Sequence, residues 1–339
     1  MNKLFLLFVL LFTNYLMFSQ NDSIILKNNN RIVGEIKSLD KSVLTLKTSF
    51  SDKDFKIKWQ HVKEVYSDHF FIVALVNGKR FSASIKTDSI NKKIILLNAG
   101  GYILESQLNE IIYLDPIGKN FLSRLTAEFD LGITLTKANN SKQFTSNALL
   151  GYGANKWKLT GSFNTVLSSQ DGVEDIKRVE GNTNFQWYLP KDWFLSTSAN
   201  FLSNSEQKLQ LRTTGKLGGG YSFINNNSMN FSTGVGLAFN NETYTDALTE
   251  NKNSLEVYFG SQFDKYDIGD LSLLTSVFAY PSLTEKGRFR ADFKFDLKYD
   301  LPWDFYIKTG VTYNFDNQPV EGTSKGDYVL QTSFGWELK

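Results

Sequence analysis

The sequence predicts an all-β protein in which a small β domain precedes a 12-stranded antiparallel up-and-down transmembrane β-barrel. Three features of residues 124–339 support the barrel. Apolar and polar residues alternate along segments of about ten to fourteen residues, the connections alternate between long and short, and most tryptophans lie beside the short connections. A period of two indicates strands, because successive side chains of a strand point to opposite faces of the sheet.

The composition excludes several classes of function. The 339 residues include 37 Lys and Arg against 35 Asp and Glu, whereas nucleic-acid binders need a basic excess. There is no cysteine, which removes disulfides, thiolate metal sites and cysteine nucleophiles. His61 and His69 are the only histidines, and few hydrolytic or zinc mechanisms can be built from two. We therefore expect no enzyme activity and no catalytic, cofactor or metal site.

Residues 1–20 have the pattern of a secretory signal peptide. Lys3 precedes a nine-residue apolar run from Leu4 to Phe12, and a more polar stretch follows. The alternative is a membrane anchor, but a spanning helix takes about twenty apolar residues. We therefore predict a cleaved leader and an exported mature chain.

Residues 21–116 contain an internal repeat at an offset of 49. Residues 28–32 (NNNRI) match residues 77–81 (NGKRF), and Ile36-Lys37 matches Ile85-Lys86. The Asn-Asn and Asn-Gly pairs are typical of hairpin turns, because Asn and Gly tolerate positive φ. Short alternating segments surround both turns. The pattern favours a tandem of two SH3-like or Sm-like small barrels that share a core.

A linker over residues 117–123 is predicted before residues 124–339, where twelve alternating segments follow one another. Strands of soluble sheets average about five or six residues, whereas a tilted strand that crosses a bilayer needs about nine to eleven. Twelve long strands in series suit closure into a membrane barrel, since no open sheet edge can face lipid. The ninth segment, near residues 271–279, is the least regular because Leu274 and Phe278 interrupt its polar phase.

The connections predict the direction of the strands. They are polar and mostly long after odd segments, as at residues 168–175, 240–253 and 316–325, and mostly short after even segments. Outer-membrane barrels have short periplasmic turns and longer outer loops, so residues 21–116 are expected in the periplasm. The predicted periplasmic aromatic girdle comprises Trp157, Trp187, Trp193, Trp303 and Trp336. The alternative, a large soluble barrel, would place the apolar faces inside.

Two segments carry a family resemblance. Gly151-Tyr152-Gly153 and the final Ser333-Phe334-Gly335-Trp336-Glu337-Leu338 resemble the family called "domain of unknown function 481", the salt-induced outer-membrane proteins. The likeness covers roughly residues 120–339 and implies an outer-membrane barrel without implying any biochemistry. Many such barrels end in an aromatic residue that the insertion machinery reads, whereas this sequence ends in Lys339, three positions after Trp336.

The polar phase of the segments is expected to line the lumen. Its charged residues are Glu128, Asp130, Arg178, Glu180, Arg212, Lys216, Glu256, Arg288, Arg290, Asp292, Lys294, Asp296, Lys298 and Lys308. Buried charges must pair or be hydrated. Two interpretations are therefore open: a water-filled, mixed-charge pore, or a salt-bridge network that fills a narrow lumen. Twelve strands lie between the eight that side chains can fill and the sixteen that leave an open channel.

Two functions follow from these interpretations. One is a narrow mixed-charge pore, a passive solute or ion channel with a periplasmic accessory domain. The other is a non-conducting anchor or binding protein that presents the periplasmic domain or the outer loops to a partner. Barrel enzymes of similar shape rely on histidine, and none follows His69. The expected partners are outer-membrane lipid and lipopolysaccharide, the barrel-insertion machinery, and a periplasmic protein or the cell wall; no nucleic acid or cofactor is expected.

Overall fold

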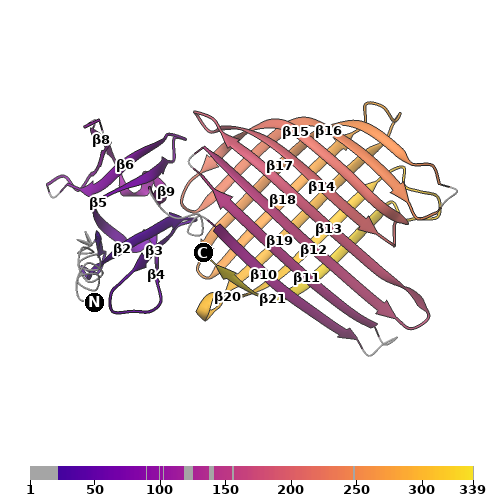
Figure 1. Ribbon diagram of the computed structural model, residues 1–339, viewed down its shortest axis with the longest axis horizontal. Coiled ribbons are helices and arrows are strands. Elements are labelled where there is room, and N and C mark those ends of the chain that lie inside the picture. The colour runs from indigo at the N-terminus through magenta and orange to yellow at the C-terminus, as the bar shows by residue number, and fades with distance from the viewer. Residues whose placement is uncertain are drawn as a thin grey trace, which may run out of the picture.

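The computed structural model describes residues 22–88, 90–98, 100–101, 103–117, 125–136, 141–154, 156–246 and 249–338. The predicted leader and nearly all of the predicted linker lie outside these residues. Within them the chain forms a nine-stranded sheet and a separate closed barrel, arranged end to end (Figure 1). No helix in the described part of the chain is long and apolar enough to cross a membrane.

The nine-stranded sheet, here called the N-terminal domain, consists of two units with the same order of elements. The first unit comprises β1 (Asp22–Leu26), β2 (Arg31–Asp40), β3 (Val43–Lys47), β4 (Phe55–Lys58), the 3-10 helix η1 (Trp59–His61) and the start of β5 (Val62–Leu75). The second comprises the end of β5, β6 (Arg80–Thr87), β7 (Ile94–Leu97), β8 (Ile103–Ser106), η2 (Leu108–Glu110) and β9 (Ile111–Pro116). Strands β2 and β6 begin 49 residues apart, as do η1 and η2, so the predicted repeat corresponds to equivalent structural elements.

Strand β5 belongs to both units. Its first half pairs with β1 and its second half with β9, and its register against β6 shifts between Ser67 and Phe71. In each unit the first strand therefore pairs with both the second and the last strand. The units are joined through one continuous strand rather than through a linker.

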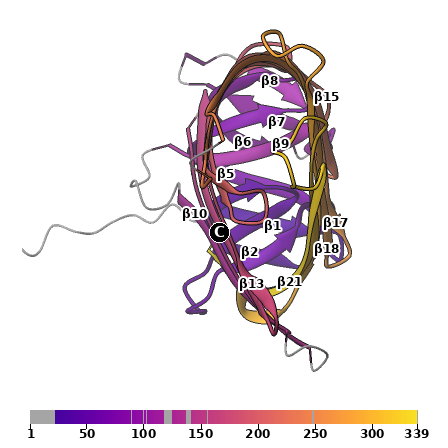
Figure 2. The same ribbon diagram turned by 90° about the vertical axis from the view of Figure 1, so that its right-hand side faces the viewer.

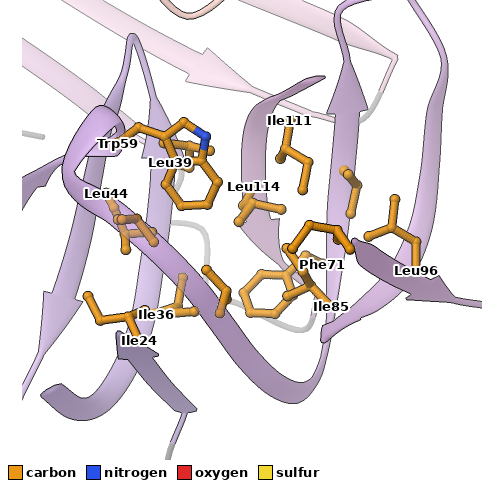
Figure 3. Packing of buried hydrophobic residues seen from close by; sticks show 14 of the residues in the cluster. Ile24, Ile36, Leu39, Leu44, Trp59, Phe71, Ile85, Leu96, Ile111 and Leu114 are labelled. Carbon is orange, nitrogen blue, oxygen red and sulfur yellow. The ribbon is translucent and has the colours of Figure 1, made fainter. Parts of the chain in front are cut away.

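Both units contribute to a single hydrophobic core (Figure 3). Ile36 and Leu44 of the first unit and Ile85 of the second are fully buried in it. Trp59 of η1 donates its Nε1–H to the carbonyl oxygen of Leu108 in η2 at 2.9 Å, so the two equivalent 3-10 helices contact each other across the core.

Twelve strands close into an antiparallel barrel in the described residues, which confirms the predicted barrel. They are β10 (Leu125–Thr136), β11 (Ser141–Gly153), β12 (Trp157–Gln170), β13 (Val173–Tyr188), β14 (Trp193–Asn204), β15 (Leu209–Asn225), β16 (Met229–Tyr244), β17 (Lys252–Ile268), β18 (Leu271–Pro281), β19 (Phe289–Asp300), β20 (Phe305–Asp316) and β21 (Gly326–Leu338), with η5 (Pro302–Asp304) before β20. Strand β10 pairs with β21, including Phe129 opposite Trp336, and closes the ring.

The two ends of the barrel differ. At the end that carries the N-terminal domain, here called the proximal end, the strands are joined by short connections. At the other, distal end the connections after β16, β18 and β20 are longer. One predicted long loop is wrong. Residues 168–175 do not form a loop, because β12 and β13 stay paired as far as Gln170 and Val173. Only Asp171 and Gly172 turn the chain, and Gly172 adopts a φ of +76° that suits glycine in such a tight turn.

The barrel has its apolar side chains outside and its charged side chains inside. Leu217 on β15 is 67% exposed, whereas Glu242 on β16 is 0% exposed. The apolar phase of the other strands is likewise exposed, as at Phe163, Leu195 and Phe259. This is the arrangement predicted for a membrane barrel and the reverse of a soluble one.

Candidate functional site: the barrel lumen and its two closures

Several contacts run across the lumen. Arg178 on β13 donates to the Asn314 side chain on β20 at 2.7 Å and pairs with Asp327 on β21 at 3.1 Å. These strands are not neighbours around the barrel, so the contacts pass through its interior. Figure 2 looks along the barrel and shows a flattened cross-section. The flattening brings opposite walls close enough for side chains to meet.

A cluster of four charged residues, here called the distal cluster, occupies the distal part of the lumen. It consists of Arg212, Glu242, Arg288 and Asp316. Arg288 donates to both carboxylate oxygens of Glu242 at 2.9 Å and to Asp316 at 2.6 Å. Arg212 donates to Glu242 at 2.7 Å and lies 3.9 Å from Asp316. Charge-assisted contacts of this kind satisfy groups that could not be buried singly.

Further pairs extend this network. Arg290 donates to Glu256 at 2.7 and 3.0 Å, and its guanidinium lies over the Tyr280 ring. Asp130 on β10 accepts from Tyr306 at 3.0 Å and from Lys308 at 2.5 Å, both on β20. The lumen therefore contains paired positive and negative side chains rather than an excess of charges of one sign.

A cavity of about 640 Å³ lies between the distal cluster and the proximal end. Its polar wall includes the amides Asn182, Asn184 and Asn200 together with the charged residues Lys158, Glu180, Asp264, Lys216, Asp292 and Lys294. Leu274, Phe278 and Tyr258 form an apolar part of the wall. The two residues that interrupted the polar phase of the ninth segment therefore face the cavity. Such a mixture suits small solutes with both polar and apolar surface.

The N-terminal domain closes the proximal end of this cavity. In Figure 2 its strands lie behind the barrel opening, and Lys41, Ser42, Arg80 and Tyr113 contribute to the cavity wall. The Arg80 guanidinium lies 4.2 Å from the centre of the Tyr188 ring at the end of β13.

Contacts around the rim hold the domain in place. Lys56 pairs with Asp304, and Lys58 donates to the carbonyl oxygen of Gly269 at 2.6 Å. Asn227 in the β15–β16 turn donates to the carbonyl oxygen of Ile111 at 2.7 Å. These contacts involve three separate proximal connections, so they fix the tilt of the domain as well as its position.

Lys41 lies at the tip of the β2–β3 hairpin and enters the cavity. Lys41 and Ser42 have φ of 45° and 69°, a strained conformation for residues other than glycine or asparagine. Burial lowers the pKa of Lys41, but the carboxylates of Asp40, Glu128, Glu337 and Asp264 outweigh that effect and the net pKa is raised. The negative charges of Asp40 and of the three barrel carboxylates therefore favour the charged form of the Lys41 ammonium group.

The chain belongs to the family "Protein of unknown function, DUF481", whose model matches residues 129–337. No curated protein matches the chain. Among solved structures, the NanC porin is 11% identical, with 62% of this chain and 97% of that chain covered and a TM-score of 0.39. The KdgM porin in complex with disordered oligogalacturonate is 8% identical over 63% and 99% of the two chains, with a TM-score of 0.35. The translocator domain of the autotransporter NalP from Neisseria meningitidis is 11% identical over 63% and 86%, with a TM-score of 0.34.

The charged residues expected to line the lumen of this DUF481 protein fall into three groups. The first group comprises Arg212 and Arg288, which belong to the distal cluster, and the neighbouring pair Glu256 and Arg290. Glu180, Lys216, Asp292 and Lys294 line the cavity. The third group has other partners. Asp130 pairs with Lys308, Lys298 with Glu337, and Asp296 with Lys294. Arg178 forms contacts across the lumen, and the charge of Glu128 acts on Lys41.

Sequence reasoning missed half of the distal cluster. Glu242 and Asp316 fall in segments that were interpreted as loops, but β16 extends to Tyr244 and β20 ends at Asp316. It also missed Lys41 and Arg80, because no local pattern indicates that a hairpin of one domain enters another. The five tryptophans all lie in or next to proximal connections or at the proximal end of β21, and Trp187, Trp193, Trp303 and Trp336 are exposed.

Proposed function

We propose that this protein is an outer-membrane barrel that forms a narrow, gated pore for small polar solutes, with the N-terminal domain as its periplasmic gate. The observation that carries the proposal is the 640 Å³ cavity, with its mixed polar and apolar wall, between two closures of different kinds. A salt-bridge network that merely filled the lumen would leave no such space. The gate contacts are few and polar, so they can separate at modest cost.

The exposed apolar surface supports the membrane location. A closed barrel with an apolar outer face avoids water only if hydrocarbon surrounds it. The proximal tryptophans suit an interfacial girdle, because an indole ring is apolar and its N–H needs a polar partner. Short connections at the proximal end support a periplasmic N-terminal domain. The strand order of its two units supports classification as a tandem of SH3-like or Sm-like barrels.

One observation favours the alternative, a non-conducting anchor. The distal cluster and Arg178 join opposite walls of the barrel, and a permanently closed lumen would not transport anything. The barrel would then serve to hold the N-terminal domain at the membrane for a partner.

Single-channel recording tests the pore. Because the chain has no cysteine, the double variant Lys56→Cys/Asp304→Cys can be cross-linked with a short bismaleimide to lock the gate. We expect discrete openings in the wild type, their loss after cross-linking, and their persistence in the same variant without linker.

Lys294→Gln, inside the cavity, is expected to change ion selectivity while openings persist. Silence of the wild type and of Glu242→Gln, which loosens the distal cluster, would favour the anchor.

A further inference from the structure

The β3–β4 hairpin carries an aromatic pair that the N-terminal domain does not bury. Phe50, in the loop between the strands, is 72% exposed, and Phe55 at the start of β4 is partly exposed. Their ring centres are 5.9 Å apart in an edge-to-face arrangement. Two exposed rings in contact form a contiguous apolar patch, and such patches mark contact sites for a protein or a membrane.

The path of the hairpin places this pair beside the barrel rim. Ser42, directly before β3, lines the cavity, and Val43 is paired with Lys58. Lys58 contacts the β17–β18 turn and Lys56 contacts Asp304 before β20. The hairpin thus begins over the lumen, is attached to two points of the rim, and continues to the Phe50 loop. Figure 1 shows it at the lower edge of the domain, and in Figure 2 an indigo hairpin protrudes beyond the outline of the barrel.

The aromatic pair is continuous with the rim aromatics. Lys53, in the same loop, lies 5.9 Å from the centre of the Trp303 ring. Trp303 is 73% exposed in the β19–β20 connection. Phe305, two residues after Trp303, stacks on Phe334 of β21 with ring centres 5.1 Å apart. The hairpin therefore extends the aromatic rim of the barrel outward.

We propose that the β3–β4 loop inserts Phe50 and Phe55 into the phospholipid headgroup region of the leaflet that faces the N-terminal domain. The inference rests on the proposed membrane location of the barrel. Aromatic rings favour this region because it accepts apolar surface next to water. Lys56 and Lys58 already contact aspartates of the rim, so the attachment is aromatic rather than electrostatic. It fixes the gate at a third point, outside the barrel wall.

Site-directed spin labelling of the full chain in phosphatidylcholine vesicles tests this insertion. The cysteine-free sequence allows single labels at Phe50→Cys, Ile90→Cys and Phe259→Cys. Ile90 is the matched control, because it is an apolar residue of the same domain that is 92% exposed. It follows β6, which starts at the rim with Arg80 and extends about 20 Å further by Thr87. Phe259 reports the outer face of the barrel.

We expect the ratio of oxygen to nickel-chelate accessibility to be severalfold higher at position 50 than at position 90, with position 259 higher still. High salt should leave the value at position 50 unchanged. Equal values at positions 50 and 90, with a lipid-like value at 259, would overturn the insertion and leave the membrane barrel intact. A water-like value at 259 would instead overturn the proposed membrane location, and the insertion with it.

Discussion

The N-terminal domain and the barrel place the same residue types on opposite sides. In the N-terminal domain Leu44 is buried and lysines such as Lys93 lie at the surface. In the barrel Leu217 is exposed and the Glu242 carboxylate is buried. Both regions consist of antiparallel strands with alternating polarity, so the backbone does not determine which phase points inward. We attribute the difference to the surrounding medium: water selects an apolar interior, and the hydrocarbon that we propose around the barrel selects an apolar exterior.

The contrast predicts that losing an interior charge will cost the barrel most. Glu242→Gln leaves Arg212 and Arg288 without their shared carboxylate, and breaking a buried pair costs about 3–5 kcal/mol. Urea unfolding of the barrel in vesicles measures the loss. Glu285→Gln is the matched control, because Glu285 pairs with the same Arg288 at 3.0 Å from a more accessible position; about 1 kcal/mol or less is expected there. Equal losses would mean that the distal cluster is not effectively buried.

The same truncation should have different costs in the two regions. Leu44→Ala opens a cavity in the N-terminal core, at a cost of about 2–5 kcal/mol. Leu217→Ala should cost less, because lipid chains refill the space and no cavity remains. Hydrogen exchange of the β3 amides in one variant and of the β15 amides in the other measures both effects. A larger loss at Leu217 would show that this side chain packs inside protein rather than facing a fluid.

Alanine substitutions at two glycines distinguish an effect on the docking of the N-terminal domain from an effect on the stability of that domain. A Cβ at Gly78 would lie 2.7 Å from the backbone nitrogen of Asp192 in the barrel, whereas a Cβ at Gly101 would meet nothing within 4 Å. Their φ values are +73° and +76°, so alanine should cost about 1–2 kcal/mol of domain stability at either position. Only Gly78→Ala should also slow cross-linking between cysteines at positions 56 and 304. Equal cross-linking rates in the two variants would contradict the docked arrangement.

The smallest expected effect is on the pH dependence of the docking of the N-terminal domain against the barrel. Burial lowers the pKa of Lys41, and the four surrounding carboxylates raise it further than burial lowers it. A raised pKa in the docked state stabilises docking at pH values below the free value of 10.5, and this contribution is lost as the pH rises through the docked pKa. The docked fraction, measured from the distance between spin labels at positions 56 and 304, should therefore fall at alkaline pH, and it should fall less in Lys41→Gly.

Lys93→Gln is the control for this pH effect. The hydrogen bond and the charge of Glu105 raise the pKa of Lys93, within the second unit and not at the rim. Its removal should leave the pH profile of the docked fraction unchanged. A profile altered by Lys93→Gln and not by Lys41→Gly would place the titrating group outside the cavity.

The number and order of barrel strands were predictable because alternation is a property of the backbone. The outer phase at Phe163 and Phe259 was recognisable from strand length, since soluble strands are shorter. The distal cluster was only partly recognisable. Glu242 and Asp316 lie where polar residues occur on both faces of the strand ends, and such sequences look like loops.

The closure of the proximal end was not predictable from any local pattern. The contact of Lys58 with Gly269 joins residues from two separate sheets, and one sequence gives no signal for it. Leu274 and Phe278 did give a signal, since they broke the polar phase of their strand. Its meaning, an apolar wall for the cavity, required the three-dimensional arrangement.

Strand β5 has a consequence for how such a domain could grow or divide. Because it ends one unit and starts the next, a proteolytic cut near Ser67 would leave one half of β5 paired with β1 and the other half paired with β9. The two units share one hydrophobic core, so they should still melt together rather than one after the other. Adding a further unit to the domain is simpler than separating the two existing units. Each extra copy needs only 49 residues, because it inherits its first strand from the copy before it.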